Sequence, residues 1–372
     1  MLREALHRSL IIPDKNPAAR LRTPPSSRPS SSRASLALPA LAPQGDLRLG
    51  PLSPIPALLR DLGVDPAPAL AACGLTVDAF DDPERRLPYR AAAGAFAQAA
   101  GASGREDFGL LLGQRFETRF LGLLGRVMSH AATVGEALHD LYRYFHLHDR
   151  GGVVYLRRRA GNTMALGYTI VDADTPGAAL VHDLVMAIGL RLLRGVAGDG
   201  FALREVLLAR ARPADVAPYR RFFAAPLQFD ATQSELRFDQ AWLQRPAMGA
   251  DPVDHEAAQR LAAQAGGAPG MAERARTVAH VLLAGGEVSA PAVAEALGLH
   301  ERTLRRRLAG EGVGIRDVVA AARFELAKQL LRDTRLPVER VAAALGYADP
   351  SAFLRAFRAW SGTTPGQWRA GH

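Results

Sequence analysis

The feature that most constrains the fold is a pattern of apolar residues that occurs twice near the C-terminal end of the chain. It occupies Val288–Leu308, VSAPAVAEALGLHERTLRRRL, and again Pro337–Trp360, PVERVAAALGYADPSAFLRAFRAW. In each copy, apolar residues at helical spacing lead to a glycine, Gly298 or Gly346, and a second helical pattern follows. Glycine adopts the left-handed conformation that ends a helix without a Cβ penalty. Each copy therefore predicts two short helices joined by a tight turn, a helix-turn-helix.

The second helix of each copy has distinct inner and outer faces. Leu304 and Leu308 mark the inner face in the first copy, and Phe353 and Phe357 take these places in the second, whose turn is one residue longer. Asp349 is a suitable N-cap for the second of these helices. The outer face of the first copy predicts a helix that enters a DNA major groove. Its arginines are Arg302, Arg305, Arg306 and Arg307. A solvated basic face on an ordinary helix is the alternative, but two copies in tandem favour DNA binding.

The residues between the two copies predict one long helix. Ile315–Leu331, IRDVVAAARFELAKQLL, has apolar residues every three or four positions and no internal glycine or proline. A helix of this length spans roughly 25 Å. It can hold two recognition helices about one DNA turn apart, roughly 34 Å, so that one chain reads two successive major-groove segments.

The stretch from about Met271 to Ala370 resembles the DNA-binding domain of AraC/XylS-type bacterial transcription regulators. The motifs that carry the resemblance are the first helix-turn-helix, AKQLLRDTRLPVERVAAALGYADPSAFLRAFRAWSG and the closing TTPGQWR. The resemblance implies an all-α C-terminal domain of seven helices, with two tandem helix-turn-helix motifs joined by a long helix. It places base-reading positions on Arg302, Arg305 and Arg306 of the first recognition helix, and near Pro350, Ser351, Leu354 and Arg355 of the second.

The predicted DNA-binding set adds His300, Thr303 and Arg358 to these positions and leaves out Pro350. It comprises His300, Arg302, Thr303, Arg305, Arg306, Ser351, Leu354, Arg355 and Arg358. Arg305 and Arg306 cannot both point fully into the groove, so we expect one of them to hold a phosphate. Pro350 and Leu354 have no side-chain donor, so we expect the second helix to read less sequence than the first. An arginine bidentate to guanine discriminates by about 1–3 kcal/mol.

Length and charge suggest how the rest of the chain is divided. With 372 residues and 48% hydrophobic content, the chain can bury sizeable cores, and two domains are expected. The net charge is +5 over residues 271–372 and −1 over residues 51–270, so the C-terminal part fits phosphate binding. The predicted division is a disordered Pro/Ser/Arg-rich tail at 1–50, a domain at 51–265, a linker at 266–272 and the DNA-binding domain at 273–370, with motifs at about 289–309 and 338–360.

The middle region predicts an α+β domain, because helical patterns interleave with short strands that we expect to be antiparallel. The predicted strands are 153–159, 164–171 and 203–209, with two more within 227–238. ADVAPYRRFFAAPLQFDATQSELRFDQAWLQRP and LPYRAAAGAFAQAA resemble the "arabinose-binding" type of N-terminal domain in one subgroup of these regulators. That resemblance implies sensing of a small molecule, dimer contacts, or both, and it does not fix the ligand.

No pattern in the sequence predicts an enzyme or a cofactor. A nucleophile elbow, a P-loop and a dinucleotide fingerprint are all missing from the sequence. His146 and His148 point to different sides of a helix and are interpreted as surface histidines, and His182–Asp183 as a core or interface pair. Cys73 has no neighbouring base and is expected to be a small buried residue. As the single cysteine it cannot form an intrachain disulfide or a cysteine-rich zinc site, so we predict no cofactor and no metal.

These observations predict a two-domain, sequence-specific regulator of transcription, and activation is favoured only by the resemblance. The predicted partners are double-stranded promoter DNA, RNA polymerase, an unknown small-molecule effector and a second copy of the chain. No apolar run is long enough to span a membrane, and a bacterial cytoplasmic, nucleoid-associated location is expected. Two alternatives stay open. The middle domain could serve only for dimerisation, or the chain could be an enzyme fused to a DNA-binding module.

Overall fold

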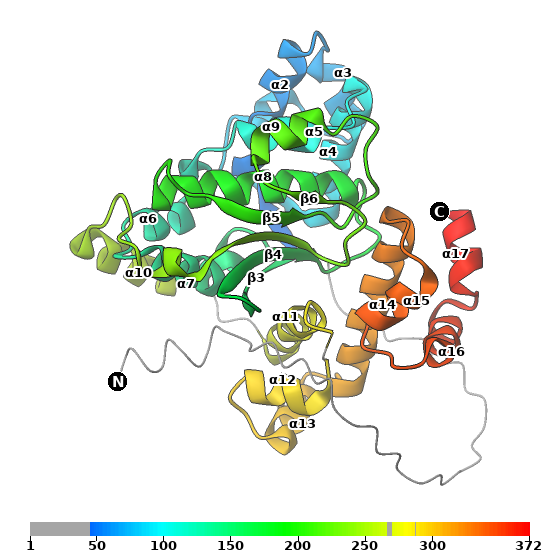
Figure 1. Ribbon diagram of the computed structural model, residues 1–372. Helices are drawn as coiled ribbons and strands as arrows, with labels where there is room; N and C mark the ends of the chain where they lie inside the picture. The colour runs from blue at the N-terminus through cyan, green and yellow to red at the C-terminus, as the bar shows by residue number, and fades with distance from the viewer. Residues whose placement is uncertain (1–44, 266–269, 287) are drawn as a thin grey trace, which may run out of the picture.

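The computed structural model describes residues 45–265, 270–286 and 288–372, and residues 1–44 of the predicted tail and 266–269 of the predicted linker lie outside this range. Within the described residues, an N-terminal α+β unit is followed by an all-α C-terminal unit, as predicted from the sequence (Figure 1). In Figure 1 the C-terminal helices lie below and beside the sheet of the N-terminal unit. Each unit has its own buried apolar cluster.

The N-terminal unit is built on a five-stranded sheet with the strand order β3-β4-β7-β5-β6. Its strands are β3 (Gly152–Arg159), β4 (Thr163–Ile170), β5 (Leu203–Leu207), β6 (Leu227–Gln228) and β7 (Ser234–Asp239). The predicted hairpin joins β3 to β4, and its turn places Gly161 and Asn162 at positive φ. The expectation of antiparallel pairing is wrong for β5 and β6, which are parallel because the chain crosses back through α9 (Ala217–Phe223) between them.

Helix α8 (Ala178–Ala197) packs on the sheet through contacts with β4 and β7. Eleven of its twenty residues are buried, which accounts for the nearly continuous apolar sequence. Besides α8 and α9, the described part of this unit has seven α-helices, of which α4, α5, α6 and α7 contact α8. The seven helices are α2 (Ile55–Asp61), α3 (Pro66–Ala71), α4 (Tyr89–Ser103), α5 (Phe108–Gln114), α6 (Leu123–Ser129), α7 (Val134–Tyr144) and α10 (Pro252–Ala265).

The folded N-terminal unit begins before the predicted boundary at residue 50. Strand β1 (Asp46–Arg48) pairs with β2 (Arg86–Pro88), and Leu49 is fully buried. Arg48 is also buried and donates through Nε to Glu84 at 2.9 Å. The last residues assigned to the tail are therefore part of the core, because a strand contributed by only a few residues leaves no periodic signal in a proline-rich sequence.

The C-terminal unit has seven helices among the described residues, as the resemblance implied. They are α11 (Met271–Leu283), α12 (Ala290–Ala296), α13 (Glu301–Gly310), α14 (Ile315–Asp333), α15 (Val338–Ala344), α16 (Pro350–Ser361) and α17 (Pro365–Gly371). The predicted inner residues Leu304, Leu308, Phe353 and Phe357 are all fully buried in one shared cluster. Figure 1 shows α12 and α13 near the lower end of α14, with α15, α16 and α17 beside α14 on its right.

The two units meet at strand β3, which is buried on both faces. Val154 packs into the core of the N-terminal unit. Its neighbours Val153 and Tyr155 point to the opposite face, where they form a separate cluster with Val281 and Ala284 at the end of α11. The C-terminal unit therefore covers part of the sheet that would otherwise expose apolar side chains.

Candidate DNA-binding interface

The first helix-turn-helix is fixed by caps at the start of each helix. The Ser289 side chain accepts from the N–H of Ala292 at 3.3 Å and begins α12. His300 is the N-cap of α13, and its Nδ1 accepts from the N–H of Arg302 at 3.3 Å. His300 thus has a local structural role at the start of the recognition helix, in addition to its predicted place near DNA. Between the helices, Gly298 has φ +65°, the left-handed conformation expected from the sequence.

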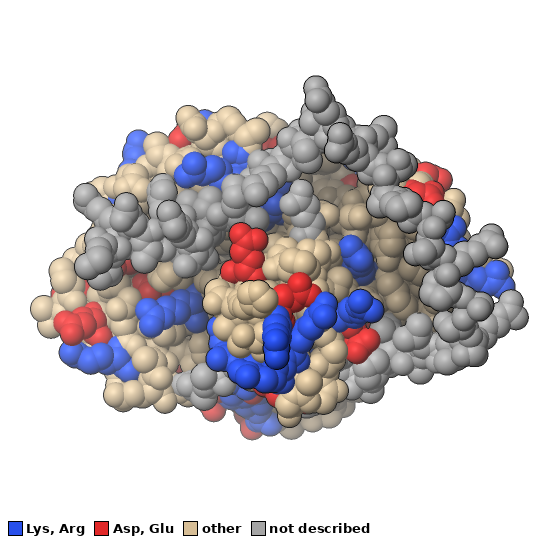
Figure 2. Space-filling view, turned by 90° about the horizontal axis from the view of Figure 1, so that it is seen from below, with Lys and Arg blue, Asp and Glu red and all other residues tan. Residues whose placement is uncertain are grey.

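Among the residues that the structure describes, the outer face of α13 is left exposed. Arg302, Arg305 and Arg306 are exposed and Thr303 is half-buried, whereas the inner leucines are fully buried. Arg305 pairs with Glu301 one helical turn earlier, with Nη2 to Oε1 at 2.5 Å. An exposed pair of this kind contributes only about 0.3–0.5 kcal/mol, so the guanidinium can exchange Glu301 for a phosphate at little cost. Figure 2 views the side of the molecule where α12 and α13 lie in Figure 1, and basic side chains gather over the middle of this face.

The second motif has the same construction with a less basic outer face. Asp349 caps α16 by accepting from the N–H of Ser351 at 2.9 Å, and Pro350 occupies the first helical position, as predicted. The predicted DNA-binding residues of this helix are all exposed. They are Ser351, Leu354, Arg355 and Arg358. With one hydroxyl, one apolar side chain and two arginines, this face has fewer groups that can read base edges than α13.

Gly346 is required by space as well as by conformation. Its φ is +77°, and a Cβ added there would lie 2.5 Å from the carbonyl oxygen of Gly286, which follows α11. Gly298 has no such neighbour within 4 Å. The turn of the second motif is therefore packed against the backbone of the first half of the unit, and the turn of the first motif is not.

Arg323 on α14 connects the two motifs and was not predicted from the sequence. Its Nε donates to the carbonyl of Leu345 at the end of α15, at 3.1 Å, and its Nη2 donates to the carbonyl of Val288 before α12, at 3.2 Å. Its guanidinium also lies 5.1 Å from the ring centroid of Tyr347. This arginine satisfies a carbonyl in each motif and so sets the position of one motif relative to the other. The only hint in the sequence was an arginine on an otherwise apolar helix.

The long helix α14 also packs against the N-terminal unit. The Gln329 amide donates to Nε2 of His182 on α8 at 2.7 Å. Lys328 is buried and its Nζ lies 3.0 Å from Asp174, in the loop before α8. The helix that joins the two DNA-binding motifs is therefore in direct contact with the domain expected to sense an effector.

The predicted interpretation of His182 and Asp183 as a core or interface pair agrees with the structure. His182 faces α14, while the Asp183 carboxylate pairs with Arg210 and accepts from the Tyr219 hydroxyl at 2.6 Å. Burial, together with the positive charges of Arg210 and Arg332, lowers the pKa of His182 to about 4. The two side chains contact different partners and do not form a catalytic dyad.

Two other expectations from the sequence are corrected. His148 is only 6% exposed and is not a surface histidine, because the chain leaves α7 through a short 3₁₀ segment at Phe145–Leu147 and turns into the sheet. Cys73 is exposed and not buried, since it lies in the turn that follows α3. Among the described residues, no group of three or more His, Cys, Asp or Glu could hold a metal ion.

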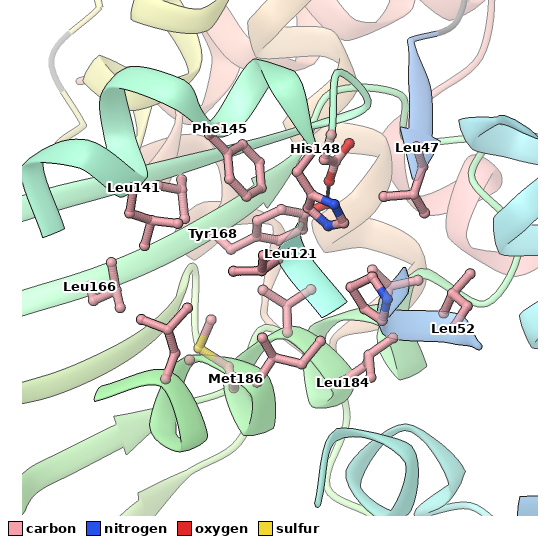
Figure 3. Close-up of a pocket in the computed structure, with 18 of the residues that line it drawn as sticks. Leu47, Leu52, Leu121, Leu141, Phe145, His148, Leu166, Tyr168, Leu184 and Met186 are labelled. Carbon is pink, nitrogen blue, oxygen red and sulfur yellow. Dashed lines mark hydrogen bonds between the residues drawn. The ribbon is translucent and has the colours of Figure 1, made fainter. Parts of the chain in front are cut away.

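A cavity of about 90 Å³ lies inside the N-terminal unit, between α8 and the sheet. Figure 3 shows Leu184 and Met186 of α8 on one side and Tyr168 of β4 on another. His148 and Phe145 project toward the same space. The sequence did not predict this cavity, since its walls come from segments that are far apart along the chain.

The fold and this surface together define a DNA-binding protein with a double helix-turn-helix. Residues 63–247 match the family described as the arabinose-binding domain of AraC transcription regulators, and residues 293–371 match a helix-turn-helix domain family. The HTH-type transcriptional regulator VirS of Mycobacterium tuberculosis is 30% identical over 328 residues, which cover 84% of this chain and 93% of VirS. The chain therefore belongs to the AraC family of transcription regulators.

The chain is also similar to a second curated regulator and to one solved structure. The ornithine utilization regulator of Pseudomonas aeruginosa is 27% identical over 320 residues, which cover 84% of this chain and 93% of that regulator. A crystal structure of the transcriptional regulator CdpR from the same species is 28% identical, covers 84% of this chain and 98% of CdpR, and superposes with a TM-score of 0.42. In the described part of the chain, no helix combines the length and apolarity needed to cross a bilayer.

Proposed function

We propose that α13 and α16 read two successive major-groove segments of promoter DNA. The observation that carries this proposal is the paired arrangement of the motifs. Both recognition helices are capped at their N-termini, bury their inner face in one shared core and leave their predicted DNA-binding residues on the surface. A helix that presents its N-terminal residues outward in this way fits a major groove.

The two recognition helices are proposed to contribute unequally. On α13, Arg302 is free of an ion pair within the described residues and is the strongest candidate for reading a guanine, while Arg305 or Arg306 binds a phosphate. On α16, Arg355 and Arg358 are proposed to bind phosphate, and Leu354 can contact only an apolar group such as a thymine methyl. Sequence specificity is then concentrated in the half-site bound by α13.

The test is a binding titration of the full chain against DNA upstream of its own gene and its neighbours, at two salt concentrations and with random DNA as competitor. We expect a retained complex on one fragment and a footprint of roughly two helical turns per chain. Binding of equal strength to all fragments that disappears with added salt would reduce the interaction to phosphate attraction and contradict the proposal.

The N-terminal unit is further proposed to sense a small molecule and to alter DNA binding through α14. The support is that α8 contributes both to the internal cavity and, through His182, to the contact with Gln329. A ligand can change DNA binding only if it binds two conformational states of the protein with different affinity. Since α8 both lines the cavity and contacts α14, a shift of α8 on ligand binding would also change the position of α14. Activation of transcription, contact with RNA polymerase, self-association and a cytoplasmic location belong to the same proposal.

Lys328→Met tests the coupling through α14. The substitution keeps most of the buried apolar stem but removes the charge that pairs with Asp174 and Glu325. Hydrogen exchange should therefore increase at residues 172–183 and at α14. The matched control is Arg316→Ala, an exposed position on the same helix. If exchange is unchanged in both variants, α14 is not held by this contact and the coupling route is wrong. In that case the effector-free alternative would be favoured.

A further inference from the structure

The walls of the internal cavity are almost wholly apolar. They include Leu121, Leu141, Leu166, Leu184, Val185 and Met186, several of which are labelled in Figure 3. A sugar carries about one hydroxyl per carbon, and each hydroxyl buried without a partner costs about 1–3 kcal/mol. The apolar side chains of this cavity could form hydrogen bonds with few of a sugar's hydroxyls. The chemistry of the cavity therefore disfavours a sugar, even though the family that the domain matches is described as arabinose-binding.

A single group of polar side chains lies at one end of the cavity. The Tyr89 and Tyr168 hydroxyls are 2.8 Å apart, and Tyr168 donates to Asp149 at 3.0 Å. Asp149 also accepts from the N–H groups of Gly151 and Gly152, at 2.7 and 3.1 Å. This carboxylate is thus satisfied by the protein itself and does not need a ligand.

His148 is the exception in this polar group. It is 6% exposed and lines the cavity, and its Nδ1 has no hydrogen-bond partner within the described residues. Burial lowers the pKa of His148 to about 3, so the ring is neutral at physiological pH. A buried ring nitrogen without a partner is costly, and one hydrogen bond from a ligand would satisfy it.

The charges around the cavity restrict the ligand further. No lysine or arginine lines the cavity, and Asp149 is an acid at its polar end. An anionic head group would lose its hydration there without gaining a cation. The volume of about 90 Å³ is smaller than the roughly 150 Å³ that holds benzene in an engineered cavity. The apolar body of the ligand should therefore have fewer than about six carbon atoms.

We propose, building on the sensing role above, that this cavity binds a small uncharged molecule with an apolar body and one hydrogen-bonding head group. The head group bonds to His148 and the tyrosine hydroxyls, and the body lies along α8. Tyr168 is also placed to report occupancy, since its ring is edge-on to His182 with centroids 6.3 Å apart, and His182 contacts α14.

The test uses the full chain labelled with ¹³C at its methionine methyl groups. Met186 lines the cavity, and Met248 is 71% exposed and serves as the internal control. The probes are 1-pentanol, pentanoate at neutral pH and L-arabinose, and Met186→Leu assigns the signal. We expect 1-pentanol to shift the Met186 methyl saturably and leave Met248 unchanged, and we expect pentanoate and L-arabinose to have no effect.

Two variants make the test specific to the cavity. Val185→Phe fills it from α8 and should abolish the shift. His148→Phe keeps a buried ring without nitrogen and should weaken 1-pentanol binding about 5- to 10-fold, the value of one hydrogen bond. The unchanged Met248 signal and the unfolding midpoint without ligand verify that each variant is folded.

The outcomes separate the ligand class from the sensing role. A Met186 methyl that 1-pentanol does not move, or a shift that persists in Val185→Phe, overturns the proposed ligand class. Saturable binding of L-arabinose at Met186 overturns it as well but leaves small-molecule sensing intact. If 1-pentanol binds as expected but hydrogen exchange at α14 and DNA affinity stay the same, the ligand class stands and the coupling to DNA binding fails.

Discussion

Replacement of Arg302 by alanine separates base reading from general attraction to DNA. Arg302 is exposed on α13, and the cap at the helix start uses its backbone N–H, which alanine retains. Alanine is also at least as good a helix former as arginine, so the fold should be unaffected. The variant therefore removes a side chain that makes no ion pair within the described residues and changes little else.

The size of the effect follows from the proposed contact. A bidentate arginine–guanine pair contributes about 1–3 kcal/mol, which corresponds to about 5- to 150-fold in affinity for the specific fragment. Random DNA offers only phosphates at this position, so its affinity should fall much less. Fluorescence anisotropy of the specific and random fragments, each at two salt concentrations, measures both quantities.

Arg260→Ala is the matched control. Arg260 is 64% exposed on α10 in the N-terminal unit and pairs with Glu256 at 2.9 Å, so the variant removes the same charge far along the chain from α13. It should leave both affinities within experimental error. If Arg302→Ala weakens specific and random DNA by the same factor, Arg302 binds phosphate only, and the assignment of base reading to this residue is refuted.

Three further predictions follow from individual contacts. Gly298→Ala should destabilise the C-terminal unit by about 1 kcal/mol, because Gly298 has a positive φ. Gly346→Ala should destabilise it by clearly more, because its Cβ would also meet the backbone of Gly286. Urea unfolding measures both losses, and equal losses would contradict this packing argument. Arg323→Ala should weaken binding to DNA that contains both half-sites, two helical turns long, but not to a one-turn DNA fragment. Arg316→Ala is the control. An equal loss of affinity on both DNA fragments would show that Arg323 does not set the spacing of the two motifs. Because the folded state lowers the pKa of His182 to about 4, the unfolded chain binds the extra proton between pH 6.5 and 4. The contribution of His182 to stability is complete above pH 6.5 and falls by up to about 3 kcal/mol toward pH 4. The buried His148 and His280 titrate in the same direction, so His182→Gln should make the decline shallower, and an unchanged pH profile in that variant would exclude His182 as a source.

The sequence predicted the C-terminal unit in detail because its signals are local. Helical spacing placed Leu304 and Phe357 in the core, and the cap at Asp349 and the turn glycine Gly298 have the conformations that their residue types favour. Each of these features depends on residues fewer than five positions apart, so no tertiary information was needed. The outward position of the α13 arginines follows in turn from the inward position of the leucines.

Only the tertiary structure decided how the parts are joined. Arg323, the contact between His182 and Gln329, and the cavity beside His148 depend on residues that the fold brings together from distant segments. The parallel pairing of β5 and β6 likewise depends on the path of the chain through α9. Side-chain periodicity reports which face of an element is buried but not which element buries it. The sequence alone therefore predicted the DNA-binding surface, while the connection between that surface and the N-terminal cavity required the folded chain.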